Sequence, residues 1–347
     1  MIENAKGNLL EADAQALVNT VNTVGVMGKG IALQFRQAFP ENYKAYQKAC
    51  QNGELQPGKM HVFATGKLTN PRYIINFPTK KHWRGKSRIE DVETGLHALI
   101  ETIKRYEISS IAVPPLGCGN GGLDWNAVRP LIEKAFEKMP ETRVLLFSPE
   151  GAPEAQTMKI ATKRPNMTAA RAALLVLFET YLLPGYQLSM LEVQKLAYFL
   201  QIAGEPLKLR FTKEKYGPYA ETVNHVLQRM DGHFIKGCGD RTQNALEKTI
   251  DLMPDALDEA KKFLVEQSPE TVDRLRHVFC LIEGFEYPHG LELLSTVHWV
   301  AQENAEAKAK ASKAVELVHS WNTRKQQQFS QREIQIAWER LQKHAWL

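Results

Sequence analysis

Two glycine-rich segments of the sequence have the composition of loops that hold phosphate groups. Each follows a short apolar run that predicts a buried strand, Ala16–Thr20 in one case and Ile111–Pro114 in the other. Glycine has no Cβ atom, so its backbone N–H can approach a phosphate closely, and the start of a following helix adds a favourable dipole. Two such loops at one edge of a sheet can hold both phosphates of a pyrophosphate. The first segment runs from Gly25 to Ala32 and contains Met27, Gly28, Lys29, Gly30 and Ile31. The second comprises Pro115, Leu116, Gly117, Cys118, Gly119, Asn120, Gly121, Gly122 and Leu123.

Other phosphate-binding and catalytic patterns fit poorly. Neither segment matches the P-loop G-x-x-x-x-G-K-[ST] or a clean G-x-G-x-x-G fingerprint, which disfavours kinases, nucleoside triphosphatases and Rossmann dehydrogenases. The alternative is that these glycines only form turns. Cys118 has no histidine placed to activate it, so we interpret it as a small turn residue. The histidines show no H-E-x-x-H or similar pair, and we expect neither a metal site nor a cofactor.

Asparagines accompany the glycine segments. Asn8 stands in Gly7-Asn8-Leu9 near the N-terminus, Asn19 lies near the end of the first predicted strand, and Asn22 follows three residues later. A turn-forming role explains Asn19 equally well. Because Asn22 directly precedes the first glycine segment, it is a candidate hydrogen-bonding partner for a ribose hydroxyl.

The elements that position these residues alternate between strands and helices up to about residue 150. The predicted strands are Ala16–Thr20, His61–Ala64, Tyr73–Phe77, Ile111–Pro114 and Val144–Phe147. Apolar residues at helical spacing predict helices between them, and this alternation predicts a layered α/β domain around a largely buried sheet. The two helical stripes are Ile89, Val92, Leu96, Leu99, Ile100 and Ile103, and Val128, Leu131, Ile132, Ala135 and Phe136.

The second half of the chain has a different pattern of apolar residues. Ser148–Asn166 is rich in Pro, Gly, Ala and Thr, lacks an amphipathic period and marks a boundary. Beyond it, apolar stripes such as Val272, Leu275, Val278 and Ile282 predict helices almost throughout. We therefore expect a first domain over 1–155, a linker over 156–167 and a second, mainly α-helical domain over 168–347.

Composition bounds the class of protein. The 347 residues suffice for two domains, and the four cysteines (Cys50, Cys118, Cys238, Cys280) lack paired spacing, which indicates a reducing compartment without disulfides. The N-terminus has no signal-peptide features and no apolar run approaches the roughly 20 residues of a membrane span, so we expect a cytoplasmic protein. A net charge of +5 does not by itself indicate a nucleic-acid partner.

The segments GNLL, ALVNTVNTVGVMGKGIALQF, INFPTK and PPLGCGNGGLDW together resemble the macrodomain family and, within it, the DarG-type antitoxins. The resemblance covers about residues 1–150. It implies a mixed sheet between helices, ADP-ribose as ligand and product, and hydrolysis of ADP-ribose from thymine bases in single-stranded DNA. It also implies a partner, the DarT-like DNA ADP-ribosyltransferase toxin that attaches the group.

The same resemblance implies roles for individual residues. Asn8 stands where many macrodomains have an aspartate that contacts the adenine amine, and a carboxamide can still accept that hydrogen bond. Asn22 is expected to hold the distal ribose, Met27–Ile31 and Leu116–Gly122 the diphosphate and ribose, and Lys80 matches the catalytic lysine. The other expected ADP-ribose contacts are Gly7, Leu9, Asn19, Pro115 and Leu123.

One position departs from the family pattern. The protein-directed glycohydrolases of this branch have an aspartate where this sequence has Gly121, and Asp124 follows only three residues later. No acid–base partner of Lys80 is therefore assigned. Asp124 itself serves equally well as the cap of the next helix.

Lys80 suits the cleavage of an N-glycosidic bond. The reaction passes through a cationic sugar, which an amine with a lowered pKa can attack, directly or as a Schiff base. Burial beside another cation would lower that pKa, and Lys81 is the adjacent cation in the sequence. By itself, KKHWRGKSR is also typical of a solvated basic loop. A third interpretation is nucleic-acid binding, because basic side chains with His82 and Trp83 suit phosphate contacts and base stacking.

The second domain loosely resembles the Panacea-type domain of antitoxins. The similarity lies in Q-K-L-x-Y (Gln194–Tyr198) and Y-G-P-Y (Tyr216–Tyr219), within roughly 169–239. We expect Tyr216 and Tyr219 to be exposed aromatic anchors for a partner protein, although a turn with two packing tyrosines is the plain alternative. The acidic run 251–270 is either a surface that imitates DNA or a solvated helix face.

These observations predict an antitoxin that is an ADP-ribosyl glycohydrolase acting on DNA, joined to a domain that neutralises the toxin. The alternatives are a macrodomain that binds ADP-ribose without turnover, a protein-directed ADP-ribosyl hydrolase, and a purely protein-binding antitoxin.

Overall fold

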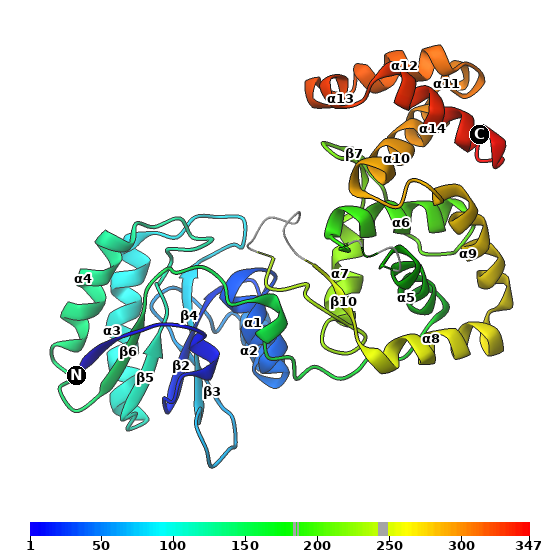
Figure 1. Cartoon of the computed structure of the whole chain (residues 1–347). Coiled ribbons are helices and arrows are strands. Elements are labelled where there is room, and N and C mark those ends of the chain that lie inside the picture. Colours follow the sequence, from blue (N-terminus) through cyan, green and yellow to red (C-terminus); the bar gives the residue numbers. More distant parts are fainter. Residues whose placement is uncertain (183–184, 186, 242–248) are drawn as a thin grey trace. The chain divides into compact units, whose positions relative to one another are not determined.

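The chain forms two compact units in the computed structural model, which describes residues 1–182, 185, 187–241 and 249–347 (Figure 1). Unit 1 comprises Met1–Lys163 and a short stretch that begins at Gly239, and unit 2 begins at Arg164. Met158 is buried and the N–H of Ala161 donates to the carbonyl of Gln37, so the first residues after 155 pack on unit 1. The domain and linker boundaries expected from the sequence stay a prediction.

Unit 1 is built on a mixed six-stranded sheet in the order β1-β6-β5-β2-β4-β3. All neighbouring strands are parallel except β3, which is antiparallel to β4. The expected mixed sheet is thus confirmed, but β1 was not predicted, because I-E-N-A has no apolar run and gains its partner β6 only from the far end of the unit. The strands are β1 (Ile2–Ala5), β2 (Ala16–Asn22), β3 (His61–Ala64), β4 (Tyr73–Lys80), β5 (Ser110–Val113) and β6 (Arg143–Phe147).

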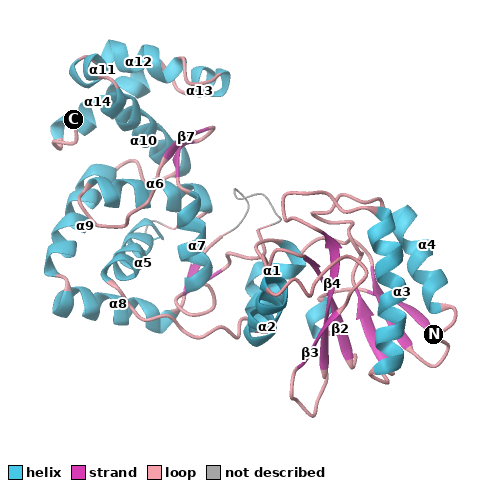
Figure 2. Ribbon diagram, turned by 180° about the vertical axis from the view of Figure 1, so that it is seen from behind, coloured by secondary structure: helices cyan, strands magenta, loops and turns pink. Residues whose placement is uncertain are grey.

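Helices cover both faces of this sheet (Figure 2). Alternate strand residues point to opposite faces, so Val18 and Ile75 pack with α3 (Ile89–Arg105) and α4 (Trp125–Phe136), whereas Leu17 and Ile74 pack with α1 (Gly30–Ala38). α2 (Pro40–Gln51) follows α1, and the short 3-10 turns are η1 (Leu9–Glu11) and η2 (Ala155–Thr157). The two predicted helical stripes form the buried faces of α3 and α4.

Unit 2 is mainly helical, as the sequence predicts. Prolines at the first turn mark the starts of α8, α9 and α10, and serine capping boxes mark those of α6 and α14. Its helices are α5 (Ala169–Leu182), α6 (Met190–Ile202), α7 (Glu221–Met230), α8 (Pro254–Gln267), α9 (Pro269–Ile282), α10 (Pro288–Glu303), α11 (Ala305–Ala309), α12 (Ala311–His319), α13 (Thr323–Gln328) and α14 (Gln331–Lys343). Two small hairpins are β7 (Thr212–Glu214) with β8 (Gly217–Tyr219), and β9 (Ile235–Lys236) with β10 (Asp251–Leu252).

The Q-K-L-x-Y and Y-G-P-Y motifs hold α6 against β8. The side-chain amide of Gln194 exchanges two hydrogen bonds with the backbone of Ala220, and the Lys195 amine donates to the Pro218 carbonyl at 2.7 Å. The expectation that Tyr216 and Tyr219 are exposed is wrong, because both are half-buried. Tyr216 packs under Arg324, and the Tyr219 hydroxyl is bonded to Glu221 and Asn224. These contacts give both motifs a structural role.

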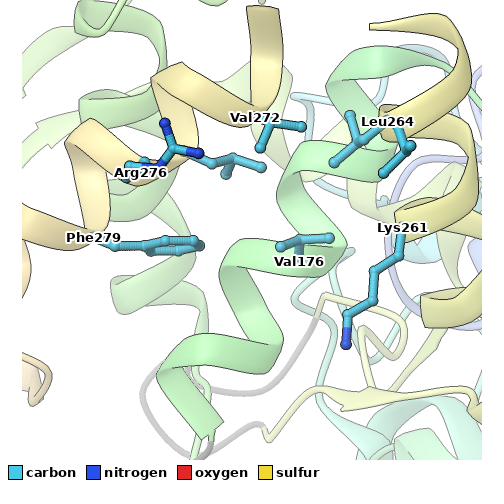
Figure 3. A pocket seen from close by; sticks show the side chains of 8 residues that line it. Val176, Lys261, Leu264, Val272, Arg276 and Phe279 are labelled. Atoms are coloured by element: carbon cyan, nitrogen blue, oxygen red, sulfur yellow. The ribbon is translucent and has the colours of Figure 1, made fainter. Parts of the chain in front are cut away.

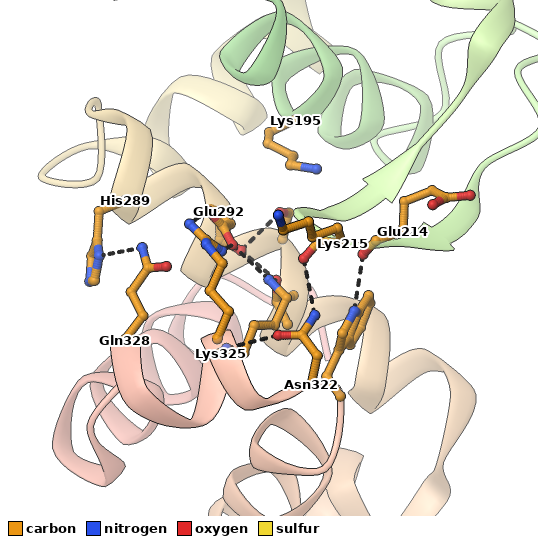
Figure 4. Close-up of polar contacts among 12 residues, drawn as sticks. Lys195, Glu214, Lys215, His289, Glu292, Asn322, Lys325 and Gln328 are labelled. Atoms are coloured by element: carbon orange, nitrogen blue, oxygen red, sulfur yellow. Dashed lines mark hydrogen bonds and ion pairs between the residues drawn. The ribbon is translucent and has the colours of Figure 1, made fainter. Parts of the chain in front are cut away.

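A buried charge cluster joins α10 to α13 (Figure 4). The Glu292 carboxylate accepts hydrogen bonds from Arg324 and from Lys325, and the Lys325 amine also donates to Thr296 at 2.9 Å. Burial raises the pKa of Glu292, but the hydrogen bonds and charges of Arg324 and Lys325 outweigh it and hold the pKa below its ordinary value. Burial, followed by the charge of Lys325, lowers the pKa of Lys195 to about 7. This cluster is therefore a paired structural site in which each charge depends on its partners.

Two features are absent from the residues that the structure describes. No helix there is both long and apolar enough to cross a membrane. The same residues contain no group of three or more His, Cys, Asp or Glu side chains arranged to hold a metal ion.

Candidate functional site

The candidate site lies at one edge of the sheet of unit 1. Because β2, β4 and β5 are parallel neighbours, their carboxyl ends emerge together, with β2 between the other two. The segments 23–29, 81–88 and 114–124 follow these three ends, so residues separated by almost 100 positions in the sequence meet here. This is the edge at which open α/β sheets bind their ligands.

Lys80 is the last residue of β4 and lies beside the second glycine segment. Its amine donates to the carbonyl oxygen of Asn120 at 3.1 Å, so the structure brings together two residues that the sequence placed in one site. Partial burial lowers the pKa of Lys80. The expected effect of burial is present, whereas the charge of Lys81 does not contribute to the shift.

The second glycine segment is a compact series of turns. Leu123 N–H donates to the Gly117 carbonyl at 3.1 Å, and Ser87 N–H donates to the Gly121 carbonyl at 3.0 Å. A Cβ atom at Gly121 would lie 2.3 Å from both the Gly117 oxygen and the Ser87 Oγ, so a side chain at 121 requires the backbone to move. The family's aspartate is therefore incompatible with this loop, and a Lys–Asp pair at that position is not available to Lys80.

Gly119 differs from Gly121 in a way that can be tested. A Cβ atom at Gly119 meets no atom within 4 Å and its backbone angle is ordinary, so Gly119→Ala should keep ADP-ribose binding. Gly119→Glu should abolish binding, because it brings a negative charge to the segment expected to hold phosphates, and Gly119→Gln should retain more affinity. Gly121→Ala should lose binding through displacement of the loop. Calorimetric titration with ADP-ribose measures all four, and equal affinities for the Glu and Gln variants would contradict the phosphate assignment.

Asn22 holds the loop that follows β2. Its Oδ1 accepts from the N–H groups of Val24 (3.1 Å) and Val26 (3.3 Å), and its Nδ2 donates to the Val26 carbonyl at 2.5 Å. The Tyr46 hydroxyl donates to the Asn22 carbonyl at 2.7 Å. Sequence reasoning missed Tyr46, because one buried tyrosine in a polar helix has no local signal. Asn22 is 5% exposed, so this geometry favours a positioning role, and its contact with ribose stays a prediction.

Asn19 and Met27 lie behind this loop, since both are fully buried. Asn19 donates to Asn76 Oδ1 at 2.9 Å and to the Met27 sulfur at 3.8 Å. Its Oδ1 is buried and has no partner among the described residues. Both side chains therefore support the loop from the interior of unit 1.

The first residue of α1, Gly30, is hydrogen-bonded within unit 1. Gly30 adopts a positive φ of 60°, and its N–H donates to the Asp240 carbonyl at 2.9 Å. This N–H is therefore not free for a phosphate in this arrangement. Lys29, directly before it, is exposed, while Gly28 and Ile31 are partly exposed.

In the N-terminal segment, Gly7 lies at the surface and Leu9 lies in the core. Gly7 is exposed with a positive φ of 89°, and Asn8 caps η1 by accepting from the Leu10 N–H at 3.0 Å. The Asn8 oxygen has a second lone pair for an adenine amine. Leu9 is 4% exposed and packs in the core under the sheet, so its side chain contributes packing.

Cys118 and Asp124 do not provide a competing reactive group. Burial, and next the charge of Asp124, raises the pKa of the Cys118 thiol to about 11, so it is protonated at neutral pH. Asp124 caps α4 by accepting from the Asn126 N–H at 3.0 Å. Both observations agree with the structural alternatives, and Lys80 is the group in this site whose pKa is shifted toward reactivity.

Two known proteins that are similar to nearly the whole of this chain carry the same activity in their names. The Macro domain family matches residues 18–132. A DNA ADP-ribosyl glycohydrolase of Thermus aquaticus is 49% identical over 344 residues, which cover 99% of this chain and 93% of that protein. One of Mycobacterium tuberculosis is 43% identical over 356 residues, 98% of this chain and 99% of the relative.

Solved structures match less than half of the chain. The macrodomain of Mycobacterium tuberculosis DarG is 53% identical and covers 43% of this chain and 99% of that one, with a TM-score of 0.43. A structure of Thermosipho africanus DarTG in complex with ADP-ribose is 34% identical over 46% of this chain and 44% of that one, with a TM-score of 0.40.

Proposed function

The chain belongs to the family of DNA ADP-ribosyl glycohydrolases, and from this we propose that its macrodomain removes ADP-ribose from thymine bases of single-stranded DNA with Lys80 as the reactive residue. The family resemblance noted in the sequence, and the expected enzyme class, are thereby confirmed. The base, the site residues and the role of the second unit belong to the proposal.

The observation that carries the proposal is the contact between Lys80 and the second glycine segment. The Lys80 amine is 3.1 Å from the Asn120 carbonyl, at an edge where the loops after β2 and β5 supply backbone groups for the phosphates and riboses. Partial burial favours the neutral amine, which attacks the anomeric carbon. The base leaves with the electron pair of the broken bond and takes up the proton that the lysine nitrogen loses. Water then releases the sugar from the lysine as ADP-ribose.

The direct test is hydrolysis by the purified full-length protein. We expect release of ADP-ribose from single-stranded DNA that carries ADP-ribosylated thymidine, and little release from ADP-ribosylated protein. Binding of ADP-ribose without turnover of either substrate would favour the binding-module alternative. Faster turnover of the protein substrate would favour the protein-directed hydrolase.

The second unit carries the other half of the proposal, which is neutralisation of a DarT-like transferase. An apolar groove of about 270 Å³ lies between α5, α8 and α9. Figure 3 shows Val176, Val272 and Phe279 directed into one space, with Lys261 at its edge. Val265, which also lines the groove, is 73% exposed. Buried apolar anchors dominate protein interfaces, and this groove offers a place for one.

Neutralisation should not depend on catalysis. Full-length protein with Lys80→Ala should still bind the transferase and inhibit it, whereas Val265→Asp should weaken inhibition and leave glycohydrolase activity intact. Inhibition of DNA modification, measured for Val265→Asp in the Lys80→Ala background so that hydrolysis does not reverse the modification, reports neutralisation, and release of ADP-ribose by the single variant reports hydrolysis. Glu316→Lys, on α12, is a control for a surface charge change away from the groove. No transferase binding would reject neutralisation, and salt-sensitive DNA binding that persists in Arg84→Ala with Lys86→Ala would favour a second unit that contacts DNA.

A further inference from the structure

The segment 81–88 directly follows Lys80 and carries unpaired positive charge. Lys81, Arg84, Lys86 and Arg88 are all exposed, and the segment contains no acidic residue. None of these four side chains forms an ion pair within the ranges that the structure describes. Four basic groups so close together repel one another, and an anionic ligand relieves that repulsion.

An exposed aromatic stack lies within the same segment. Trp83 is 46% exposed, whereas the other five tryptophans of the chain are half-buried or buried. The His82 and Trp83 rings are stacked with centroids 5.3 Å apart, and the Arg84 guanidinium lies 4.6 Å from the Trp83 ring centroid. The Arg84 N–H donates to the His82 ring and the Gly85 N–H to the His82 carbonyl, so a turn holds the stack in shape.

Hydrogen bonds fix both ends of the segment to the site. The Lys81 carbonyl accepts from the Thr23 N–H (3.1 Å) and from its hydroxyl (2.9 Å). At the other end, the Ser87 N–H donates to the Gly121 carbonyl in the second glycine segment, and Ser87 is 6% exposed. The stack is therefore held beside Lys80, and a ligand that binds it does not have to order the whole loop.

We propose that residues 81–88 bind the DNA strand on either side of the modified base. An unpaired base extends the His82–Trp83 stack, and Lys81, Arg84 and Lys86 contact the neighbouring phosphates. Flat bases joined by regularly spaced phosphates match aromatic rings interleaved with cations, whereas a modified protein offers neither. This inference rests on the proposed function and adds how the enzyme selects a DNA strand over other ADP-ribosylated molecules.

The test compares two substrates of the full-length protein, an ADP-ribosylated single-stranded oligonucleotide and ADP-ribosylated thymidine alone. Trp83→Ala should lower kcat/KM on the oligonucleotide by roughly 5- to 150-fold, which corresponds to one lost base stack. It should leave kcat/KM on the nucleoside unchanged, and Trp83→Phe should keep most of the oligonucleotide activity. Arg84→Ala with Lys86→Ala should reduce the log–log salt slope of DNA binding by about 1.4, since each phosphate contact contributes about 0.7.

A charge-matched control variant and a separate measurement of DNA binding complete the test. Lys134→Ala with Lys138→Ala removes the same charge from exposed positions at α4 and just beyond its end, and should leave the salt slope unchanged. Equal wild-type kcat/KM on both substrates, or an equal loss on both in Trp83→Ala, would overturn the inference. Binding of an unmodified oligonucleotide tests the segment separately: if the wild type hydrolyses neither substrate, the proposed function fails, while binding weakened by Trp83→Ala would still support the DNA-binding segment.

Discussion

Replacement of Lys80 by alanine is expected to lower kcat on ADP-ribosylated DNA by about 10²- to 10⁴-fold and to leave the affinity for ADP-ribose nearly unchanged. The Lys80 amine acts at the anomeric carbon, so its loss affects the transition state more than the bound ground state. Lys80 contacts the second glycine segment only through the Asn120 carbonyl, and that segment is held by its own backbone hydrogen bonds. Single-turnover release of ADP-ribose and calorimetric titration separate the two effects.

The pH dependence gives an independent check on the same residue. Burial lowers the pKa of Lys80, so the neutral amine is populated at lower pH than for a solvated lysine. The rate of the chemical step should rise with pH and level off above this lowered pKa, and Lys80→Arg should lose that rise because arginine remains charged. Wild-type rates in Lys80→Ala, or a rate that falls over the same pH range, would show that a neutral lysine is not the reactive group.

The largest loss of stability is expected in unit 2, from Glu292→Ala. Glu292 is 2% exposed and neutralises Lys325, which is fully buried, and also pairs with Arg324. Removal of this carboxylate leaves the buried Lys325 and the half-buried Arg324 without their ionic partner, and should lower the free energy of unfolding by about 3–5 kcal/mol. Denaturant unfolding of the full-length protein, followed by probes in each unit, measures the change, and ADP-ribose binding by unit 1 should persist.

Two comparison variants distinguish the loss of a buried ion pair from the loss of any carboxylate. Glu316→Ala removes a carboxylate that is 64% exposed and pairs with Lys313, so unfolding should change by no more than about 1 kcal/mol. Glu292→Leu combined with Lys325→Met removes the close pair together and should be less destabilising than Glu292→Ala alone. An effect of Glu292→Ala no larger than that of Glu316→Ala would show that the cluster does not hold α10 to α13.

Local sequence patterns were enough for much of unit 1. The alternation of apolar strands with helical stripes predicted five of the strands and the helices α3 and α4, because each element must bury its own apolar residues. The family resemblance placed Lys80 and the second glycine segment in one site. The structure brings the Lys80 amine to the Asn120 carbonyl because parallel strands deliver their carboxyl ends to the same edge. The short polar strand β1 escaped prediction because its stability comes from β6, far away in the sequence.

The sequence by itself therefore indicated most elements of unit 1, and its family resemblance implied the mixed sheet and Lys80 as the candidate reactive residue. Burial and long-range contacts decided what the individual polar residues do. Asn22 is already hydrogen-bonded to Val24, Val26 and Tyr46. The Y-G-P-Y motif is hydrogen-bonded to α6 through the Pro218 carbonyl. Gly121 excludes an aspartate because Ser87, from another loop, fills the space. Apart from those with Val24 and Val26, these contacts join residues that are far apart in the sequence, so residue type and local spacing do not reveal them.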